Sequence, residues 1–416
     1  MWKLLYSCGI HLFALGIRIA SIWNKKARAA IVGRRENGLE ALQQWRRQLP
    51  AEQKIYWFHC ASLGEYEQGL PLIQLLKERE PGKLILLTFF SPSGFQNYKP
   101  NPAISYIAYL PFDTAKNAVQ LAEIGPIEAV FVVKYEFWFN WLNALKEKQV
   151  KVYLVSGLFH GQQPFFKWYG GWMRRQLGSF EYFFLQDDRS RRLLEKMGYL
   201  NASVSGDTRF DRVRQIAANP KRFDLIEKFC KDQFTIVAGS TWPEDEVFLT
   251  AAMALKNWGD KVKVILVPHE IGEKHIEDLE QQTKGQRWTK VNALNVNEKN
   301  IMIVDAMGML SSLYQYATVA YIGGGFGTGI HNVLEAAVFG KPTIFGPNYV
   351  KYIEAVRLVE LKGASIIQSA KDLEVLIARF IAEPDFLQRS GKISEQFVVE
   401  NSGVSEQIYS SISGKC

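Results

Sequence analysis

The chain has 416 residues, which is too long for one ordinary hydrophobic core and fits two domains of about 150 to 200 residues with an appendage. Hydrophobic residues make up 47% of it and charged residues 22%, a composition that excludes a disordered chain. The formal net charge is +8, but residues 1–35 hold seven Lys or Arg and no acid, which leaves +1 for the rest; cations gathered in an apolar N-terminus do not favour nucleic-acid binding.

The first predicted element is a helix over residues 4–23, mostly apolar and just long enough to cross the hydrocarbon core of a bilayer. On a helical wheel its polar residues form one stripe: Lys3, Ser7, His11, Arg18, Ser21 and Lys25. This pattern is typical of a helix on an anionic membrane surface, and the cations place the remainder of the chain in the cytoplasm. Two alternatives remain, a spanning helix and a helix docked on the protein's own core.

Strand and helix patterns alternate from residue 54 onward, which predicts an α/β fold. The first half offers apolar strand candidates at 55–59, 83–90, 104–110, 129–133, 151–155 and 182–185. After residue 209 the alternation starts again, with candidates at 234–238, 263–267, 301–304, 319–322, 343–345 and 365–367. We expect two Rossmann-like domains, each with its ligand-binding edge at the carboxyl ends of the strands.

Two carboxylates follow strand candidates in the first half. Glu65, in HCASLGEYEQG, falls in the first turn of a helix after the strand 55–59. Glu136, in VVKYEFWFN with Trp138, directly follows the strand 129–133. Both are candidates for acid–base or acceptor-side work, but Glu65 could merely complement a helix dipole and Glu136 could pair with Lys134.

The segment FFKWYGGWMRR at 165–175 combines aromatic residues with Lys167, Arg174 and Arg175. Aromatic side chains suit a membrane interface and cations suit phosphate, so it is a candidate surface for a glycolipid; the alternative is a core-packed helix with solvated basic ends. Gly170 and Gly171 would weaken a helix there.

The second half places polar residues after several strands. Ser240 and Thr241 stand at a predicted helix start in AGSTWPEDE, His269 follows a strand in VPHEIGEK, and Gly308 lies in DAMGML. A helix cap explains Ser240 and Thr241 equally well, and a lone His is usually structural.

The stretch GGGFGTGIHNVLEAAVFGKPTIFGP, from residue 323 to 347, reads as a glycine loop between a strand and a helix that begins near His331. Glycines such as Gly324 and Gly325 let a backbone approach a ligand closely, and the helix start offers an anion site. His331 and Glu335 would share a helical face beside Asn332, which suits a nucleotide. The alternative is a loop that only closes a βα unit.

These motifs together resemble those of the bacterial 3-deoxy-D-manno-octulosonic acid (Kdo) transferases. The matching family patterns are ASxGE, ETELWPN, GNxKFD, GSTxxGEE, PRHPER, D-x-x-G-x-L and GG…GHN-x-LE…GKP-x-x-FGP. The chain departs from them at Lys134, where a glutamate is usual, at Ile330, where a glycine is usual, and beside His269, where the arginine is missing.

The resemblance implies a GT-B glycosyltransferase with an interdomain cleft, which moves Kdo from CMP-Kdo to a lipid A precursor with inversion. It implies Glu65 as general base and Glu335 as the ligand of the ribose hydroxyls. The other donor contacts implied are Arg209, Ser240, Thr241, His269, Gly308, Gly324, Gly325, His331 and Asn332. Glu136 and Trp138 fall on the acceptor side or have a structural role, and the enzyme would work on the cytoplasmic side of the inner membrane.

We therefore expect a membrane-associated helix and basic flank at 1–35, an acceptor domain at 36–212 and a nucleotide-sugar domain at 213–416 whose last helix packs back on the first. We expect no cofactor or metal, because the sequence has neither a His cluster with zinc spacing nor an Asp-x-Asp motif. Two alternatives stay open: a GT-B transferase that uses a UDP-sugar and a lipid acceptor, and a non-catalytic membrane-associated nucleotide-sugar binder.

Overall fold

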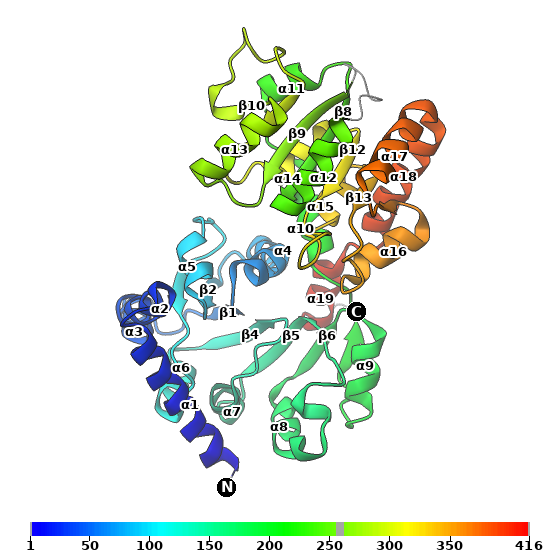
Figure 1. The fold of residues 1–416 in the computed structure, drawn as a ribbon. Helices are drawn as coiled ribbons and strands as arrows, with labels where there is room; N and C mark the ends of the chain where they lie inside the picture. The colour runs from blue at the N-terminus through cyan, green and yellow to red at the C-terminus, as the bar shows by residue number, and fades with distance from the viewer. Residues whose placement is uncertain (1, 255–261, 415–416) are drawn as a thin grey trace. The chain divides into compact units, whose positions relative to one another are not determined.

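The computed structural model describes residues 2–254 and 262–414, and the chain divides into two compact units. Unit 1 comprises residues 1–212 together with 403–416, and unit 2 comprises residues 213–402. The chain thus returns to unit 1 at its end, where the helix α19 (Val404–Ile412, red in Figure 1) packs on α4 (Leu63–Arg79).

Unit 1 is built on a seven-stranded parallel sheet of order β3-β2-β1-β4-β5-β6-β7. Its strands are β1 (Ile55–Cys60), β2 (Leu84–Phe89), β3 (Tyr106–Tyr109), β4 (Ile127–Val133), β5 (Lys151–Gly157), β6 (Tyr182–Leu185) and β7 (Ala202–Val204). Its other helices are α1 (Trp2–Ala20), α2 (Lys25–Glu36), α3 (Leu39–Arg47), α5 (Pro92–Asn97), α6 (Ala115–Ala122), α7 (Phe139–Glu147), α8 (Gly171–Gln176), α9 (Asp188–Glu195) and α10 (Arg209–Ala218), which runs into unit 2.

Both faces of this sheet are covered, because alternate strand residues point to opposite sides. Trp57 and Val130 belong to the core beneath α6 and α7, whereas Phe58 and Phe131 belong to the core beneath α4 and α19. Ile408 of α19 is fully buried in that second core. The last helix is therefore a structural part of unit 1.

Unit 2 repeats the architecture with a parallel sheet of order β10-β11-β9-β8-β12-β13-β14. Its strands are β8 (Phe234–Thr241), β9 (Val262–Pro268), β10 (Gln286–Arg287), β11 (Ile301–Ile303), β12 (Val319–Ile322), β13 (Thr343–Phe345) and β14 (Ala364–Ile366). Its helices are α11 (Asp224–Cys230), α12 (Pro243–Ala254), α13 (Glu273–Thr283), α14 (Leu310–Leu313), α15 (Leu334–Ala337), α16 (Ile353–Leu361), α17 (Ala370–Ala382) and α18 (Pro384–Glu400). The predicted α/β class with two Rossmann-like sheets is confirmed.

The N-terminal helix α1 is docked on unit 1 along one side. The hydroxyl of Tyr6 donates a 2.7 Å hydrogen bond to Asp113, and its ring packs on Phe139. Ile10 and Ala14, one and two turns further along, are buried. The alternative of a helix that packs on the protein's own core therefore holds for this side.

The opposite side of α1 is apolar and exposed. Its large side chains are between 47% and 71% accessible: Leu4, Leu5, Leu12, Leu15, Ile19 and, just after the helix, Ile22 and Trp23. Among the described residues α1 is also the one helix long and apolar enough to cross a bilayer. The helix α1 therefore has one side docked on unit 1 and an opposite side of exposed apolar side chains.

One local prediction needs correction. The helix expected from His331 begins only at Leu334 and is four residues long, because the side chain of Asn332 accepts the backbone N–H of Leu334 and holds a turn in its place. The aromatic segment at 165–175 is interrupted at Gly170 and Gly171, as expected from these two glycines: the short 3₁₀ turns Pro164–Phe166 and Trp168–Gly170 precede the helix α8. Phe165 is consequently buried, whereas Trp168 is 93% exposed.

Candidate active site

The candidate residues of each unit lie where its strand order reverses. In unit 1 the connections run outward from β1 in one direction and from β4 in the other, and these two strands are neighbours. In unit 2 the same holds for β8 and β12. Ligands of open parallel sheets bind beyond the carboxyl ends of such a strand pair. Glu65 follows β1 and Glu136 follows β4, while Thr241 ends β8 and Gly323 follows β12.

Glu65 lies in the first turn of α4, whose N-cap is Ser62. The Ser62 hydroxyl accepts the backbone N–H of Glu65, and the carboxylate of Glu65 folds back to accept the N–H of Ala61. Both bonds satisfy free amides at a helix start, as a capping arrangement does. The same bonds fix the carboxylate at the carboxyl end of β1.

Glu136 is held from two sides. The indole N–H of Trp138 donates a 2.7 Å hydrogen bond to Oε2 of Glu136. Nε2 of His59 lies 3.7 Å from the same oxygen and has no hydrogen-bond partner, although the ring is fully buried. The other ring nitrogen, Nδ1, is 2.9 Å from the hydroxyl of Thr88. His59 therefore faces the carboxylate at ion-pair distance with one nitrogen and is oriented by Thr88 through the other.

The two carboxyls differ in acidity. Burial raises the pKa of Glu65 and the negative charge of Glu136 raises it further, while the N–H of Ala61 and the charges of His59 and Lys134 act against this. Burial would also raise the pKa of Glu136, but attraction to His59 and the hydrogen bond from Trp138 outweigh it and leave that pKa lowered. Two neighbouring carboxyls with opposite pKa shifts are typical of acid–base chemistry.

Arg209 belongs to unit 1 and begins α10. Its guanidinium pairs with the buried carboxylate of Asp207, at 2.8 Å from Nε and from a terminal nitrogen. Gln68 donates to the other oxygen of Asp207 at 2.6 Å. Asp207 thus orients Arg209. The other residues predicted to bind the sugar donor lie in unit 2.

The glycine loop of unit 2 serves close packing of backbone on backbone. A side chain at position 323 would meet the carbonyl oxygen of Ser240 at 2.2 Å, and one at position 325 would meet the backbone of Gly346 at 2.4 Å. Gly324 has a φ of +91°. Ser240, a non-glycine residue with a φ of +52°, is itself in a sparsely populated conformation. These glycines therefore bring three loops together at the carboxyl edge of the sheet.

Asp245 holds this loop and was missed in the sequence. It is fully buried in the first turn of α12 and accepts three hydrogen bonds, from the N–H groups of Gly324 (2.7 Å) and Trp242 (2.9 Å) and from the hydroxyl of Tyr321 (2.8 Å). The sequence PEDE does not distinguish Asp245 from its neighbours, because acidic residues are common in the first turn of any helix. The N-cap amide of α12 and the glycine loop thus share one carboxylate.

Three rings gather beside the loop. Trp242 stacks on His269 with centroids 4.4 Å apart, His269 lies 4.7 Å from His331, and the indole N–H of Trp242 donates to Nε2 of His331 at 3.1 Å. Burial and the neighbouring His269 lower the pKa of His331, so its ring is neutral at physiological pH. The structure thus brings two predicted residues together with Trp242, a third that sequence reasoning did not single out.

Asn332 and Glu335 lie just after these rings. The side-chain amide of Asn332 donates to the carboxylate of Glu335 at 3.2 Å, and Glu335 is half-buried. The hydroxyl of Thr241 is buried and donates to Glu246 at 2.9 Å, and Glu246 also lies 3.2 Å from His275. The hydroxyl of Thr241 therefore forms its hydrogen bond within the protein and is not accessible to a phosphate.

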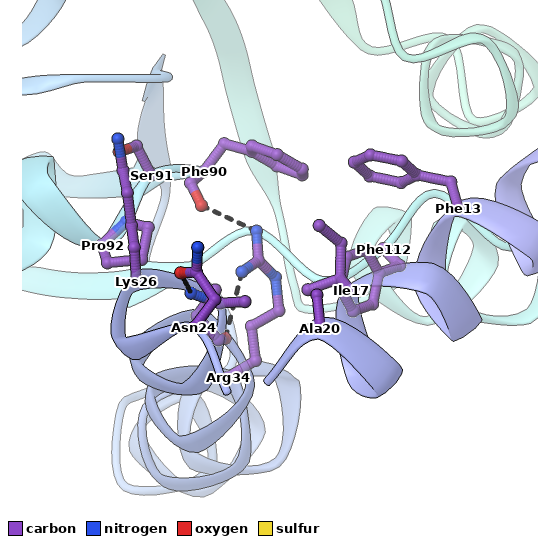
Figure 2. A pocket seen from close by; sticks show the side chains of 12 residues that line it. Phe13, Ile17, Ala20, Asn24, Lys26, Arg34, Phe90, Ser91, Pro92 and Phe112 are labelled. Carbon is purple, nitrogen blue, oxygen red and sulfur yellow. Dashed lines mark hydrogen bonds between the residues drawn. The ribbon is translucent and has the colours of Figure 1, made fainter. Parts of the chain in front are cut away.

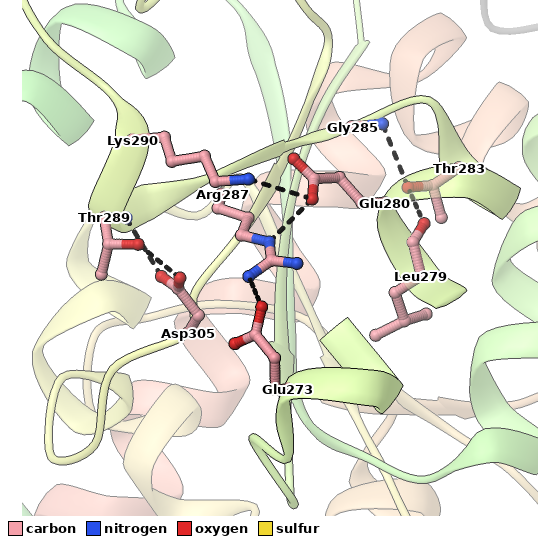
Figure 3. Close-up of polar contacts among 9 residues, drawn as sticks. All are labelled: Glu273, Leu279, Glu280, Thr283, Gly285, Arg287, Thr289, Lys290 and Asp305. Atoms are coloured by element: carbon pink, nitrogen blue, oxygen red, sulfur yellow. Dashed lines mark hydrogen bonds and ion pairs between the residues drawn. The ribbon is translucent and has the colours of Figure 1, made fainter. Parts of the chain in front are cut away.

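The loop that carries Gly308 is fixed at its base. Figure 3 shows Asp305 accepting the N–H and the hydroxyl of Thr289, at 3.0 and 2.5 Å. Beside it the buried Arg287 pairs with Glu273 and Glu280, at 2.6 and 2.7 Å, and ties α13 to β10. Arg287 is thus neutralised by two carboxylates and does not replace the arginine that is missing beside His269. Gly308 itself is exposed with a φ of +77°.

Comparison with known proteins identifies the first unit. Residues 36–212 match the family model described as 3-deoxy-D-manno-octulosonic-acid transferase (kdotransferase). This chain carries a Kdo transferase domain. The predicted resemblance to the Kdo transferases, and with it the prediction of a glycosyltransferase, is confirmed.

Relatives extend the match into the second unit. A 3-deoxy-D-manno-octulosonic acid transferase of Aquifex aeolicus is 27% identical over 312 residues, 74% of this chain and 80% of its own length. A bifunctional glycosyltransferase/methyltransferase of Fusobacterium nucleatum is 26% identical over 71% of this chain, which spans 47% of that protein's length. The UDP-GlcNAc 2-epimerase of Neisseria meningitidis has a TM-score of 0.60 at 13% identity and covers 86% of this chain and 99% of its own, which supports the GT-B type of fold alone.

Proposed function

We propose that the chain transfers Kdo from CMP-Kdo to a lipid A precursor, with inversion and without a metal, on the cytoplasmic side of the inner membrane. The observation that carries this proposal is the pair Glu65 and Glu136, placed after the two central strands of a matched Kdo transferase domain and given opposite pKa shifts. Lipopolysaccharide synthesis is the setting this function requires.

Glu65 is the general base of this proposal. It takes the proton from an acceptor hydroxyl whose oxygen then forms a bond to the anomeric carbon of Kdo, while the bond from that carbon to the phosphate oxygen of CMP breaks. A raised pKa makes the carboxylate a stronger base than a free glutamate. Glu136 remains ionised and offers negative charge near the positive charge that develops on the sugar. CMP leaves with the bonding electrons.

In unit 2 we assign CMP to the edge formed by the glycine loop, His269, His331 and Glu335. Glu335 would accept the two ribose hydroxyls, and Arg209 or His269 would compensate the charge of the leaving phosphate. Gly308, Ser240 and Asn332 border the same edge in this assignment. The role of Thr241 is structural, through Glu246.

Calorimetry of nucleotide binding tests the donor. We expect CMP to bind and UDP to bind at least tenfold more weakly. Glu335→Ala should weaken CMP binding by about 3 kcal/mol or more, because two hydrogen bonds to a charged acceptor are lost, each on the order of 1.5 to 3 kcal/mol. The control is Glu360→Ala, an exposed carboxylate on α16 that pairs with Arg357. Tighter binding of UDP than of CMP would favour a UDP-sugar transferase instead.

The pH profile tests the carboxyl pair. Because Glu65 must be ionised and its pKa is raised, kcat/KM should fall on the acid side at a pH above the ordinary pKa of a glutamate, about 4.3. Glu136→Gln removes the like charge, so the acid limb of its residual activity should move to lower pH. If the acid limb stays at the same pH or moves to higher pH, the charge of Glu136 does not raise the pKa of the group that must be ionised.

The exposed side of α1 is assigned to the membrane surface. Replacing Leu12 and Leu15 together by Gln should weaken flotation with anionic vesicles at least tenfold, since burying a leucine contributes about 1.5 to 3 kcal/mol. Salt should weaken the binding of both proteins, because the flanking cations add screened attraction. Leu294→Gln, at a 95% exposed position of unit 2, is the control. Unchanged flotation of the double variant would place the attachment elsewhere, with the exposed Trp168 the next candidate.

A further inference from the structure

A cavity of about 360 Å³ lies in unit 1 between α1, α2 and the segment that follows β2. Its size is within the range of roughly 300 to 1,000 Å³ of small-molecule sites. Figure 2 shows Phe13 and Ile17 of α1 facing Phe90 and Phe112 across it. The walls are thus mainly aromatic and aliphatic, which suits a hydrocarbon chain.

Cations border this cavity. Arg34 donates to three backbone carbonyls, those of Ala30, Phe90 and Leu110, at 2.7 to 3.1 Å, and none of these partners carries a charge. Burial lowers its pKa to about 10, so it still carries a positive charge at neutral pH. Lys26 lines the cavity from an exposed position. Together they favour an apolar ligand with an anionic group.

The cavity also adjoins the candidate active site. The N–H of Ser91, which lines it, donates at 2.8 Å to the carbonyl of Ala61, whose own N–H is bound by Glu65. The ring of Phe90 stacks on Trp138 with centroids 4.7 Å apart, and Trp138 donates to Glu136. One wall of the cavity is therefore built on the residues that hold the two carboxylates.

We propose that this cavity receives one acyl chain of the phosphorylated glycolipid acceptor, and so positions the acceptor's sugar at Glu65. The proposal rests on the proposed function. Phe13, which lines the cavity, is itself 41% exposed, and Leu12 and Leu15 of the same helix are exposed as well, so apolar surface lies beside the cavity where a chain could enter. The acyl chain of a bulk phospholipid could fill the same cavity, but a phospholipid carries no sugar hydroxyl that would be placed at Glu65.

The first test fills the cavity and compares two acceptors. With CMP-Kdo as donor, Ala27→Trp should raise the KM for an acylated lipid A precursor at least tenfold and leave turnover of the fully deacylated sugar phosphate within twofold. Ala29→Trp, on the same helix but outside the lining, should change neither. An equal effect of the two tryptophans, or an equal loss on both acceptors, would overturn the proposal. Failure of the unmodified protein to use either acceptor would instead overturn the proposed function.

The second test is direct binding and needs no turnover. We expect dodecyl phosphate to bind the full chain, decyl phosphate to bind about fourfold more weakly per methylene removed, and inorganic phosphate not to bind. Ala27→Trp should abolish the binding and Ala29→Trp should keep it. Binding that survives Ala27→Trp would contradict the cavity as the site. If Ala27→Trp instead weakened binding to acceptor-free phospholipid vesicles as much as it raised KM, the occupant would be bulk lipid and our assignment wrong.

Discussion

Glu65→Gln is expected to lower kcat by about 10²- to 10⁴-fold and to leave CMP-Kdo affinity within a factor of about three. The size of the loss is that of removing a general base, which acts on the acceptor hydroxyl and not on donor binding. Glutamine keeps an oxygen that can accept the N–H of Ala61, so the fold of the α4 start should survive. Steady-state kinetics with calorimetry of the donor measures both quantities.

Glu67 provides the matched control on the same helix. Its carboxylate is 43% exposed and pairs with Arg212 at 2.6 Å. Glu67→Gln should keep kcat within threefold. Near-normal turnover of a folded Glu65→Gln protein would remove the catalytic role from Glu65.

Asp245→Ala is expected to destabilise unit 2 by about 3 kcal/mol or more. The substitution leaves three donors without a partner in a fully buried place, and each such group costs about 1 to 3 kcal/mol. For a unit of this size, 3 kcal/mol corresponds to a drop in Tm of roughly 6 to 12 °C. Because Gly324 loses its anchor, CMP affinity should fall at temperatures where the protein is still folded.

Glu244→Ala is the control for this loss, since Glu244 precedes Asp245 in the same helical turn and is exposed. Scanning calorimetry should show its Tm within about 2 °C of the unmodified protein. An Asp245→Ala protein with the same Tm as this control would mean that the three hydrogen bonds contribute nothing net.

The strands and their polar ends were predictable because they depend on local signals. Buried parallel strands are continuous apolar runs, so β1, β4, β8 and β12 were found with the residues that follow them. Short edge strands such as β7 and β10 were missed, because two or three residues carry no periodic signal.

The glycine loop was predicted correctly as a loop, but the helix after it was wrongly predicted to begin near His331 and begins only at Leu334. Helix propensity over 331–338 was overridden by Asn332, whose side chain binds the backbone N–H two residues on. The role of the glycines was predicted only in part, as a close approach of the backbone to a ligand. Their lack of side chains admits the backbone of Ser240 and Gly346, which lie far away in the sequence.

Long-range partners account for the remaining surprises. Asp245 binds Gly324, His59 faces Glu136, and Tyr6 binds Asp113, pairs separated by 77 to 107 residues and without a common motif. The wheel of α1 showed a polar stripe but not that Ile10 and Ala14 lie against unit 1. Tertiary pairing of this kind is outside what composition, periodicity and spacing contain.

The most direct test of the account is the mass of the product made by the purified full-length chain from CMP-Kdo and a lipid A precursor. We predict release of CMP together with an acceptor whose mass has increased by one or more whole Kdo residues, and formation of this product about 10²- to 10⁴-fold more slowly by the Glu65→Gln protein. An unmodified acceptor under conditions where CMP-Kdo binds, or transfer from a UDP-sugar in place of CMP-Kdo, would contradict it.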